Sequence, residues 1–402
     1  MTRRNTWFRG AALLLTVAAM AACGTEETTA DQEDFLSAKP PQFVMLAFDG
    51  SLSLSFWQES RDFAKAAAAR GAPLKFTYFA SGVYFTPESS KRSYIAPAGK
   101  GPGRSDIGFG GTTGAVALRY GQLNAAASEG HEIASHGNGH FDGTRWTADD
   151  WSSEFDQFNT LMFETPRDGV PASTAHSPDV VGYRAPLLGQ NAALYQMLPT
   201  LGFRYDTSKT ARPNYWPEKI GDVWNFPLGE LNMSGSGRRV LSMDYNFYVA
   251  HSRGLPDPAN KAKYKQQMLD TYRGYFTSNY VGNRAPIHIG HHFSKWNGGA
   301  YWEAMQEFAL EVCGQPNVRC GTYKDLLAFM DGLSPEQLAD YRRQAFSPAA
   351  AIAPIVDPAS GFGEIKVHDD AAAHDEPQEA LSEAELIYMA KSVPQALART
   401  NE

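Results

Sequence analysis

The order of apolar and polar positions divides the middle of the chain into two kinds of segment. Short unbroken apolar runs are typical of strands buried in a parallel sheet. Segments whose apolar residues recur every three or four positions are typical of amphipathic helices. The pattern predicts strands at residues 43–48, 74–79, 133–134, 180–183, 203–205, 240–244 and 287–290, and helices at residues 56–70, 118–129, 148–160, 190–201, 263–277 and 301–312. Strands that alternate with helices indicate parallel β/α units.

Polar residues with catalytic chemistry follow several of these strands directly. Asp49 ends the first apolar run, and Arg184 follows the strand at 180–183. His136 and His140 lie just after the strand at 133–134. Because β/α barrels place their active sites at the carboxyl ends of their strands, we expect these side chains to meet at one rim.

The composition is that of a folded protein with one large domain and extensions, or with two small domains. Its 402 residues are 43% hydrophobic and 12% aromatic, enough to build a full core. Eight Trp and eighteen Tyr are many for one domain. We expect core packing to account for most of them, and a few that line a groove would suit sugar binding.

The amino-terminal segment predicts export. Arg3, Arg4 and Arg9 precede an apolar stretch at residues 11–22 that is too short to span a bilayer as a mature helix. The segment from Met20 to Cys23 resembles a bacterial lipobox, in which the cysteine is lipidated. We therefore expect a signal peptide at 1–22, a lipid anchor on Cys23 in the cell envelope, and a polar tether at 23–40. Ordinary cleavage near residue 21 is the alternative.

Charge is concentrated at the other end of the chain. Residues 347–402 hold ten acidic and three basic side chains, so this tail contributes −7 to a net charge of −8. Its richness in Ala, Pro and acidic residues predicts disorder, which leaves 41–346 as the folded domain. No basic stripe is present, so we expect no nucleic-acid partner.

Two further segments affect the picture. Cys313 and Cys320 are close in sequence, and in an exported chain they suit a local disulfide, with two free buried thiols as the alternative.

Residues 86–114 are rich in Gly, Ser and Pro and too long for a plain connector. They predict either a loop that rims the active site or a disordered segment.

The histidine pair suggests metal chemistry. His136 and His140 stand four positions apart in a loop of small residues, so they can close on one divalent ion. A bound metal ion lowers the pKa of water and polarises a carbonyl. A carboxylate can then serve as the base and a histidine as the acid of an amide hydrolysis. The alternative is a surface loop with two incidental histidines.

The order of these segments resembles that of the polysaccharide deacetylases of carbohydrate esterase family 4, the NodB-like family, and in particular its chitin-deacetylase-like branch. The resemblance covers residues 42–332 and implies a distorted, incomplete (β/α) barrel. The matching segments are Phe48-Asp49-Gly50, Gly130-His131-Glu132-Ile133, His136 with His140, Arg184 with Pro186, Tyr205-Asp206-Thr207-Ser208, and residues 284–292.

The resemblance implies a role for each matched residue. Asp49 would be the general base, and Arg184 would pair with it through a bidentate guanidinium fork and orient it. His292 would be the general acid, oriented by Asp244. Tyr245 would replace a tryptophan beside the acetyl group. Strand alternation places His288 and His292 on one face of their strand and His291 on the other.

The chain departs from the family at Gly50, where the family has a metal-binding aspartate. His136 and His140 then remain as the protein ligands of a divalent ion, which we expect to be zinc. A third ligand has to come from Asp49 itself, from Asp142 or from Asp106. A shifted match would make Asp49 a metal ligand rather than the base.

Two functions follow from the resemblance. The first is a metal-dependent hydrolase that removes acetyl groups from N-acetylglucosamine units of chitin or peptidoglycan. The second is a carbohydrate-binding lipoprotein whose catalysis is weakened by Gly50, and an esterase for O-acetyl groups is a further alternative. The sequence determines neither the glycan nor the oligomeric state.

Overall fold

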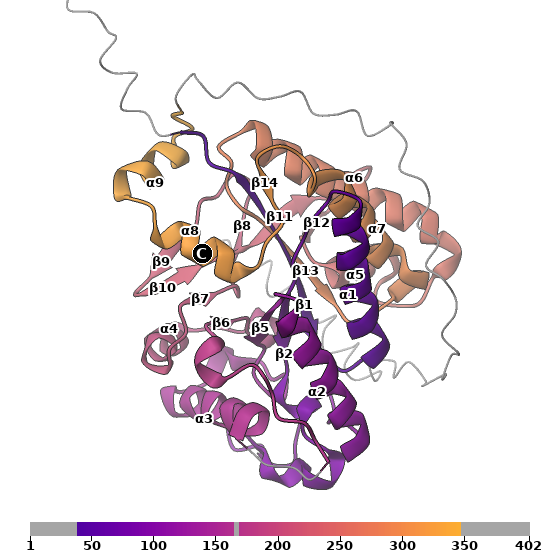
Figure 1. Cartoon of the computed structure of the whole chain (residues 1–402), viewed down its shortest axis with the longest axis vertical. Coiled ribbons are helices and arrows are strands. Elements are labelled where there is room, and N and C mark those ends of the chain that lie inside the picture. Colours follow the sequence, from indigo (N-terminus) through magenta and orange to yellow (C-terminus); the bar gives the residue numbers. More distant parts are fainter. Residues whose placement is uncertain (1–37, 165–168, 347–402) are drawn as a thin grey trace, which may run out of the picture.

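The computed structural model describes residues 38–164 and 169–346 (Figure 1). The predicted signal peptide, Cys23, most of the tether and the acidic tail lie outside the described residues. Within the described part, no helix is long and apolar enough to cross a membrane.

Short strands and longer helices alternate along most of the described chain. The larger sheet contains β1 (Gln42–Gly50), β2 (Thr77–Ala80), β5 (Glu132–Ser135), β6 (Gly182–Tyr183), β7 (Tyr205–Asp206), β9 (Glu218–Ile220), β10 (Val223–Asn225), β13 (Ile287–His292) and β14 (Val318–Arg319). A smaller sheet contains β8 (Thr210–Ala211), β11 (Leu228–Asn232) and β12 (Arg239–Leu241). A third sheet pairs β3 (Ile95–Ala96) with β4 (Gly101–Pro102). The helices are α1 (Leu54–Ala69), α2 (Thr113–Ser128), α3 (Ala148–Asn159), α4 (Ala192–Met197), α5 (Asp244–Ser252), α6 (Lys261–Val281), α7 (Trp296–Val312), α8 (Tyr323–Asp331) and α9 (Pro335–Arg342).

The larger sheet forms an open barrel of parallel strands. Its order is β13-β1-β2-β5-β6-β7-β10-β9, and every pair from β13 to β10 is parallel. The smaller sheet approaches β13 through a single bridge between Met243 and Gly290, so the ring of strands is interrupted among the described residues. The expected distorted, incomplete (β/α) barrel is confirmed.

The alternation along β1 separates two cores. Val44, Leu46 and Phe48 pack in the larger core beneath the outer helices. Met45 and Ala47 face the concave side of the sheet, where side chains from α8 and α9 fill the interior. Figure 1 shows α1 and α2 together along one side and α8 and α9 across the sheet from them. Asp49 continues the inward-facing series and ends β1 above this interior core.

Local signals explain where the helices begin. Ser53 Oγ accepts the Phe56 N–H at 3.2 Å at the start of α1. Thr147 and Asp150 form a capping box at the start of α3. The prediction of a strand through residue 244 was wrong, because β12 ends at Leu241 and Asp244 is the first residue of α5. The strand predicted from residue 74 begins at Thr77.

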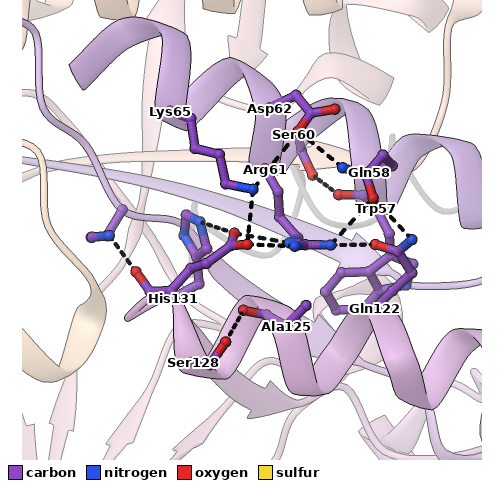
Figure 2. Close-up of polar contacts among 12 residues, drawn as sticks. Trp57, Gln58, Ser60, Arg61, Asp62, Lys65, Gln122, Ala125, Ser128 and His131 are labelled. Carbon is purple, nitrogen blue, oxygen red and sulfur yellow. Dashed lines mark hydrogen bonds and ion pairs between the residues drawn. The ribbon is translucent and has the colours of Figure 1, made fainter. Parts of the chain in front are cut away.

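An ion cluster joins α1 to the turn after α2 (Figure 2). The Arg61 guanidinium donates two hydrogen bonds to the Glu129 carboxylate, one of them at 2.9 Å from Nε. Lys65 Nζ lies 3.0 Å from the same carboxylate. Hydrogen bonds from Arg61 and Lys65 hold the pKa of Glu129 at about 2. This cluster fixes the turn that leads into β5.

The cysteine prediction is confirmed. Cys313 and Cys320 form a disulfide with their Cα atoms 5.5 Å apart. It closes the connection between α7 and the segment that follows β14, which pairs with the first residues of β1. The bond therefore ties a local loop at the amino end of the sheet, far along β1 from Asp49.

Candidate active site

The chain turns sharply just after Asp49. Gly50 has φ +107° and Ser51 has φ +110°. Trp57 Nε1 donates to the Ser51 carbonyl at 2.9 Å, and the Ser81 N–H donates to the Gly50 carbonyl at 3.2 Å. A left-handed φ favours glycine at position 50. A Cβ at Gly50 would meet no atom within 4 Å, so the position has open space beside it.

Asp49 and Arg184 form a buried ion pair. Arg184 Nη1 lies 2.7 Å from Asp49 Oδ1, and the Arg184 side chain is fully buried. Burial alone would lower the pKa of Arg184, but the Asp49 charge outweighs it and raises that pKa. The predicted bidentate fork is wrong, because Arg184 Nε donates to Thr207 Oγ1 at 2.7 Å and Nη2 to the Tyr323 hydroxyl at 3.3 Å.

Residues after β7 help to hold Arg184 and Ala185 in place. Ser208 Oγ accepts the Ala185 N–H at 2.8 Å and donates to the buried Asp206 carboxylate at 2.6 Å. Asp206 also accepts the Tyr195 hydroxyl of α4 at 2.8 Å. The family resemblance includes residues 205–208 but implies no role for them. The structure shows that they hold Arg184 and the residue after it in place.

His136 and His140 lie close together in the loop after β5. Their ring centroids are 5.3 Å apart. His136 Nδ1 lies 2.8 Å from the Arg184 carbonyl oxygen, so Nδ1 carries the proton and Nε2 is free to act as a ligand. Burial lowers the pKa of both rings, that of His140 to about 3. Neutral imidazoles are the form that binds metal ions.

Glu154 of α3 shapes this loop from beneath. Its fully buried carboxylate accepts the Asn138 N–H at 2.6 Å and the Tyr94 hydroxyl at 2.8 Å. Gly137 has φ +65°, and a Cβ there would lie 3.0 Å from the Glu154 carboxylate. Burial raises the pKa of Glu154, although its hydrogen bonds act in the opposite direction. Sequence reasoning missed Glu154 and Tyr94.

The long segment at 86–114 packs on the histidine loop. The Asp106 N–H donates to the Gly139 carbonyl at 2.9 Å, and β3 and β4 form a small hairpin within the segment. Gln157 of α3 bonds both the N–H and the carbonyl of Ile95. The segment is thus ordered and lies beside the histidine loop. This agrees with the first of the two alternatives, a loop that rims the active site.

The described residues do not complete a three-ligand metal site. No group of three His, Cys, Asp or Glu side chains in residues 38–164 and 169–346 is placed to hold a metal ion. Asp142 caps the short helix that follows it, and its carboxylate accepts the Thr144 N–H at 2.9 Å. The side chain of Asp106 is exposed. Among these carboxylates, Asp49 is the one whose charge acts on both His136 and His140.

His292 ends β13 beside Asp49. The two residues are direct partners in the register of the parallel strands β1 and β13. Asp244 Oδ1 lies 2.7 Å from His292 Nδ1, and Asp244 Oδ2 accepts the His292 N–H at 2.9 Å. Burial alone would lower the pKa of His292, but the Asp244 carboxylate outweighs it and raises that pKa. The predicted pairing of Asp244 with His292 is therefore present in the structure.

The neighbouring histidines face other surroundings. His291 is buried against Phe48 and Tyr272 on the outer side of β13, and its Nδ1 lies 3.6 Å from Asp244. His288 stacks on Phe226 and Tyr323 on the inner side. His288 and His291 therefore lie on opposite faces of the strand, as predicted. His292 keeps a 19% exposed side chain against 3% for His291, so His292 is the more accessible ring.

The comparisons with known proteins concern the fold. No family model and no curated protein match the chain. Among solved structures, the chain is similar to a protein from Mycobacterium smegmatis described as a polysaccharide deacetylase, with 17% identity, a TM-score of 0.44 and coverage of 79% of this chain and 99% of that one. It is also similar to the chitin deacetylase from Colletotrichum lindemuthianum, with 15% identity, a TM-score of 0.40 and coverage of 75% and 92%.

A third similar structure is a mutant described as a pseudoenzyme of carbohydrate esterase family 4, with 10% identity, a TM-score of 0.40 and coverage of 72% of this chain and 68% of that one. Proteins described as polysaccharide and chitin deacetylases are thus among those that the chain is similar to. At these identities and TM-scores, the residues of the rim have to carry any assignment of activity.

Proposed function

We propose that the chain is a deacetylase that hydrolyses N-acetyl groups on N-acetylglucosamine units of a polysaccharide such as chitin or peptidoglycan. One observation carries this proposal. A carboxylate held by a buried arginine and an imidazole held by a buried carboxylate lie side by side at the carboxyl ends of β1 and β13. A base and an acid so placed can serve the two proton transfers of amide hydrolysis.

In this mechanism Asp49 takes the proton from the attacking water. The ion pair with Arg184 orients its carboxylate. His292 donates a proton to the leaving nitrogen from Nε2, because its Nδ1 is engaged by Asp244. Asp244 raises the pKa of His292 and so favours the protonated ring that this step needs.

A divalent ion, for which we propose zinc, would be held by His136 and His140 and would polarise the acyl carbonyl. Two imidazoles alone hold an ion weakly. Asp49 is the carboxylate whose charge acts on both rings, and the open space beside Gly50 could admit a third ligand. The absence of a carboxylate at position 50 also favours the second candidate, a carbohydrate-binding protein whose catalysis is weakened.

Metal content and acetate release test the proposal together. The purified protein should retain a divalent ion after dialysis, and His136→Ala should lose it. Gly50→Asp should raise the affinity for the ion, at some cost in stability because its φ is +107°. Undiminished metal content in His136→Ala would contradict the assigned ligands.

Acetate release should be measured on chitin oligomers, peptidoglycan and O-acetylated glycans. Release from the N-acetylated substrates supports the deacetylase, and release from O-acetylated glycans alone supports an esterase. If the metal-loaded protein binds a glycan but releases no acetate from any of them, the binding-protein alternative holds.

A further inference from the structure

Trp296 differs from the other tryptophans of the described chain. Six of them are buried, with at most 7% of their surface exposed: Trp57, Trp146, Trp151, Trp216, Trp224 and Trp302. Five of these six donate their indole N–H to an oxygen of the protein. Trp296 is half-buried, and within residues 38–164 and 169–346 its indole N–H has no protein acceptor. It is thus the described tryptophan that is placed to contact a ligand.

Its position is next to the proposed general acid. The Trp296 ring centroid lies 5.3 Å from that of His292. The indole stacks on Tyr248 at 5.1 Å with an interplanar angle of 6°, and Tyr245 lies 5.4 Å away at 61°. These two tyrosines belong to α5, the helix that begins with Asp244. The same helix therefore supports both the histidine and the tryptophan.

The backbone holds Trp296 firmly in this place. The three residues after it, Asn297, Gly298 and Gly299, all have positive φ values of 52–84°. Asn297 accepts the Asp257 N–H at 2.7 Å and donates to the Tyr301 hydroxyl at 2.9 Å. Asn adopts this region more readily than other residues with a side chain, and the hydrogen bonds of Asn297 fix the turn that follows Trp296. A ring that is fixed in advance loses little side-chain entropy when it binds.

We propose that Trp296 forms a glycan subsite that binds the sugar next to the unit being deacetylated. This inference rests on the proposed function, because it takes His292 as the group that meets the leaving nitrogen. The neighbouring pyranose of a polymer then lies within reach of a ring only 5.3 Å from His292. A pyranose presents electron-poor C–H groups that suit an aromatic surface, and its hydroxyls can accept the free indole N–H.

The substrate class follows from this subsite. A chain of neutral β-linked sugars gains binding free energy from Trp296 that a single sugar does not reach. We therefore expect the protein to prefer oligomers of N-acetylglucosamine over the monomer, which has no neighbouring sugar for Trp296. Trp296 acts in binding, so its loss should raise KM for the oligomer and leave kcat little changed.

The experiment compares the parent with Trp296→Ala and Trp296→Phe, on the tetramer and the monomer of N-acetylglucosamine. Trp296→Ala should raise KM for the tetramer about tenfold and KM for the monomer much less. Trp296→Phe should restore most of the loss. Leu118→Ala is the matched control, because Leu118 is an exposed apolar side chain on α2, and it should change neither value.

Fluorescence provides a readout that does not need activity. The tetramer should protect the parent from acrylamide quenching, and this protection should be lost in Trp296→Phe. Protection together with the KM change supports the subsite. Acetate release with equal KM values in the parent and in Trp296→Ala would overturn the subsite and leave the proposed function standing.

An inactive parent is also informative. If the tetramer still protects the indole, the subsite is supported and the proposed hydrolysis is overturned. If the tetramer gives neither protection nor acetate release, both are overturned.

Discussion

Two buried carboxylates at the rim have different partners and therefore different roles. Asp49 is paired with a guanidinium that stays charged at any pH the protein meets and that holds one oxygen of its carboxylate. Asp244 is paired with an imidazole, which can gain or lose its proton near neutral pH. The first pair suits a base and the second suits an acid.

The first prediction separates these roles from that of the adjacent histidine. Asp49→Asn and His292→Ala should each lower deacetylation of acetylated chitin oligomers by about 10²–10⁴-fold, the range typical of general acid–base catalysis. His291→Ala should cost far less activity, because His291 is buried behind the strand. Steady-state acetate release, with circular dichroism to check folding, measures all three. Equal losses at His291 and His292 would show that the acid is wrongly chosen.

The second prediction concerns pH. The proposed mechanism requires the acid form of His292, so activity should fall as pH rises through a pKa that Asp244 raises above the ordinary value of 6.5. Asp244→Asn removes the main cause of this rise and leaves the effect of burial, which lowers the pKa. The alkaline limb of the kcat/KM profile should therefore move to lower pH. An unchanged limb would exclude His292 as the group that titrates there.

The elements explain how such short strands can hold a site. β6 and β7 are two residues long, yet Arg184 just after β6 is fixed by the hydrogen bonds that it donates to Thr207, after β7, and to Tyr323 of α8. The histidine loop is similarly fixed by α3 through Glu154. The ends of the strands place the side chains, and the neighbouring elements orient them.

The third prediction tests the support of the histidine loop. Glu154→Ala should leave the Asn138 N–H and the Tyr94 hydroxyl without their acceptor, which costs about 2–4 kcal/mol of unfolding free energy. It should also weaken metal binding at His136 and His140. Urea unfolding and metal titration measure the two effects. Asp156→Asn on the exposed side of the same helix is the control, and an equal loss in it would argue against a specific role of Glu154.

The fourth prediction concerns the ion cluster between α1 and the turn after α2. Glu129 has a folded pKa of about 2, below its ordinary value of 4.5. Its stabilisation is therefore fully present above pH 4.5 and is lost as pH falls toward 2. Glu129→Gln should lower the unfolding free energy by about 1–3 kcal/mol at pH 7, and the difference from the parent should shrink near pH 2.

Asp62→Asn is the matched control for that change. The Asp62 carboxylate is 57% exposed and lies 3.9 Å from Lys65 Nζ, so its removal should have little effect. Denaturant unfolding of both variants at several pH values decides the matter. A difference for Glu129→Gln that is independent of pH would contradict the electrostatic account.

The elements that the sequence predicted share a simple physical cause. β1 carries an unbroken apolar run because both of its faces are buried, and β5 keeps the apolar pair Ile133-Ala134 between the buried polar residues Glu132 and Ser135. Asp244 was misplaced because residues 240–243 carry the strand signal and the helix begins without a side-chain cap. α8 and α9 were not predicted, although each begins with a capping box. Their packing inside the barrel is a property of the tertiary structure.

The candidate site was predictable only in part, because its supporting contacts also depend on the tertiary structure. Asp49, Arg184 and His292 end strands, so position along the chain was enough to bring them together. Thr207, Tyr323 and Glu154 act through partners 16 to 139 residues away. No local pattern marks such contacts. The resemblance assigned the bidentate fork, and the actual neighbours of Arg184 replace it.

At the scale of the whole molecule, β1 links the two ends of the domain. The described chain begins at residue 38, next to the amino end of β1, and Asp49 stands near its carboxyl end. Nine residues of strand separate the two ends by about 30 Å. A segment that enters the domain before β1 therefore enters on the side away from the catalytic rim.

This polarity gives the predicted lipid anchor a consequence. We propose that the protein is exported and lipid-modified at Cys23, on the evidence of Arg3, Arg4, Arg9 and the apolar stretch that follows them. If Cys23 is the anchor, the chain that leads from it joins the described domain at the amino end of β1, opposite the rim. The last prediction is therefore that the mature protein begins at a diacylglyceryl-modified Cys23 and fractionates with membranes, whereas Cys23→Ser does not. Intact-mass spectrometry of the mature protein and fractionation of cells measure this directly. An unmodified amino terminus near residue 22 on a soluble exported protein would show simple secretion, and the orientation argument would then no longer apply.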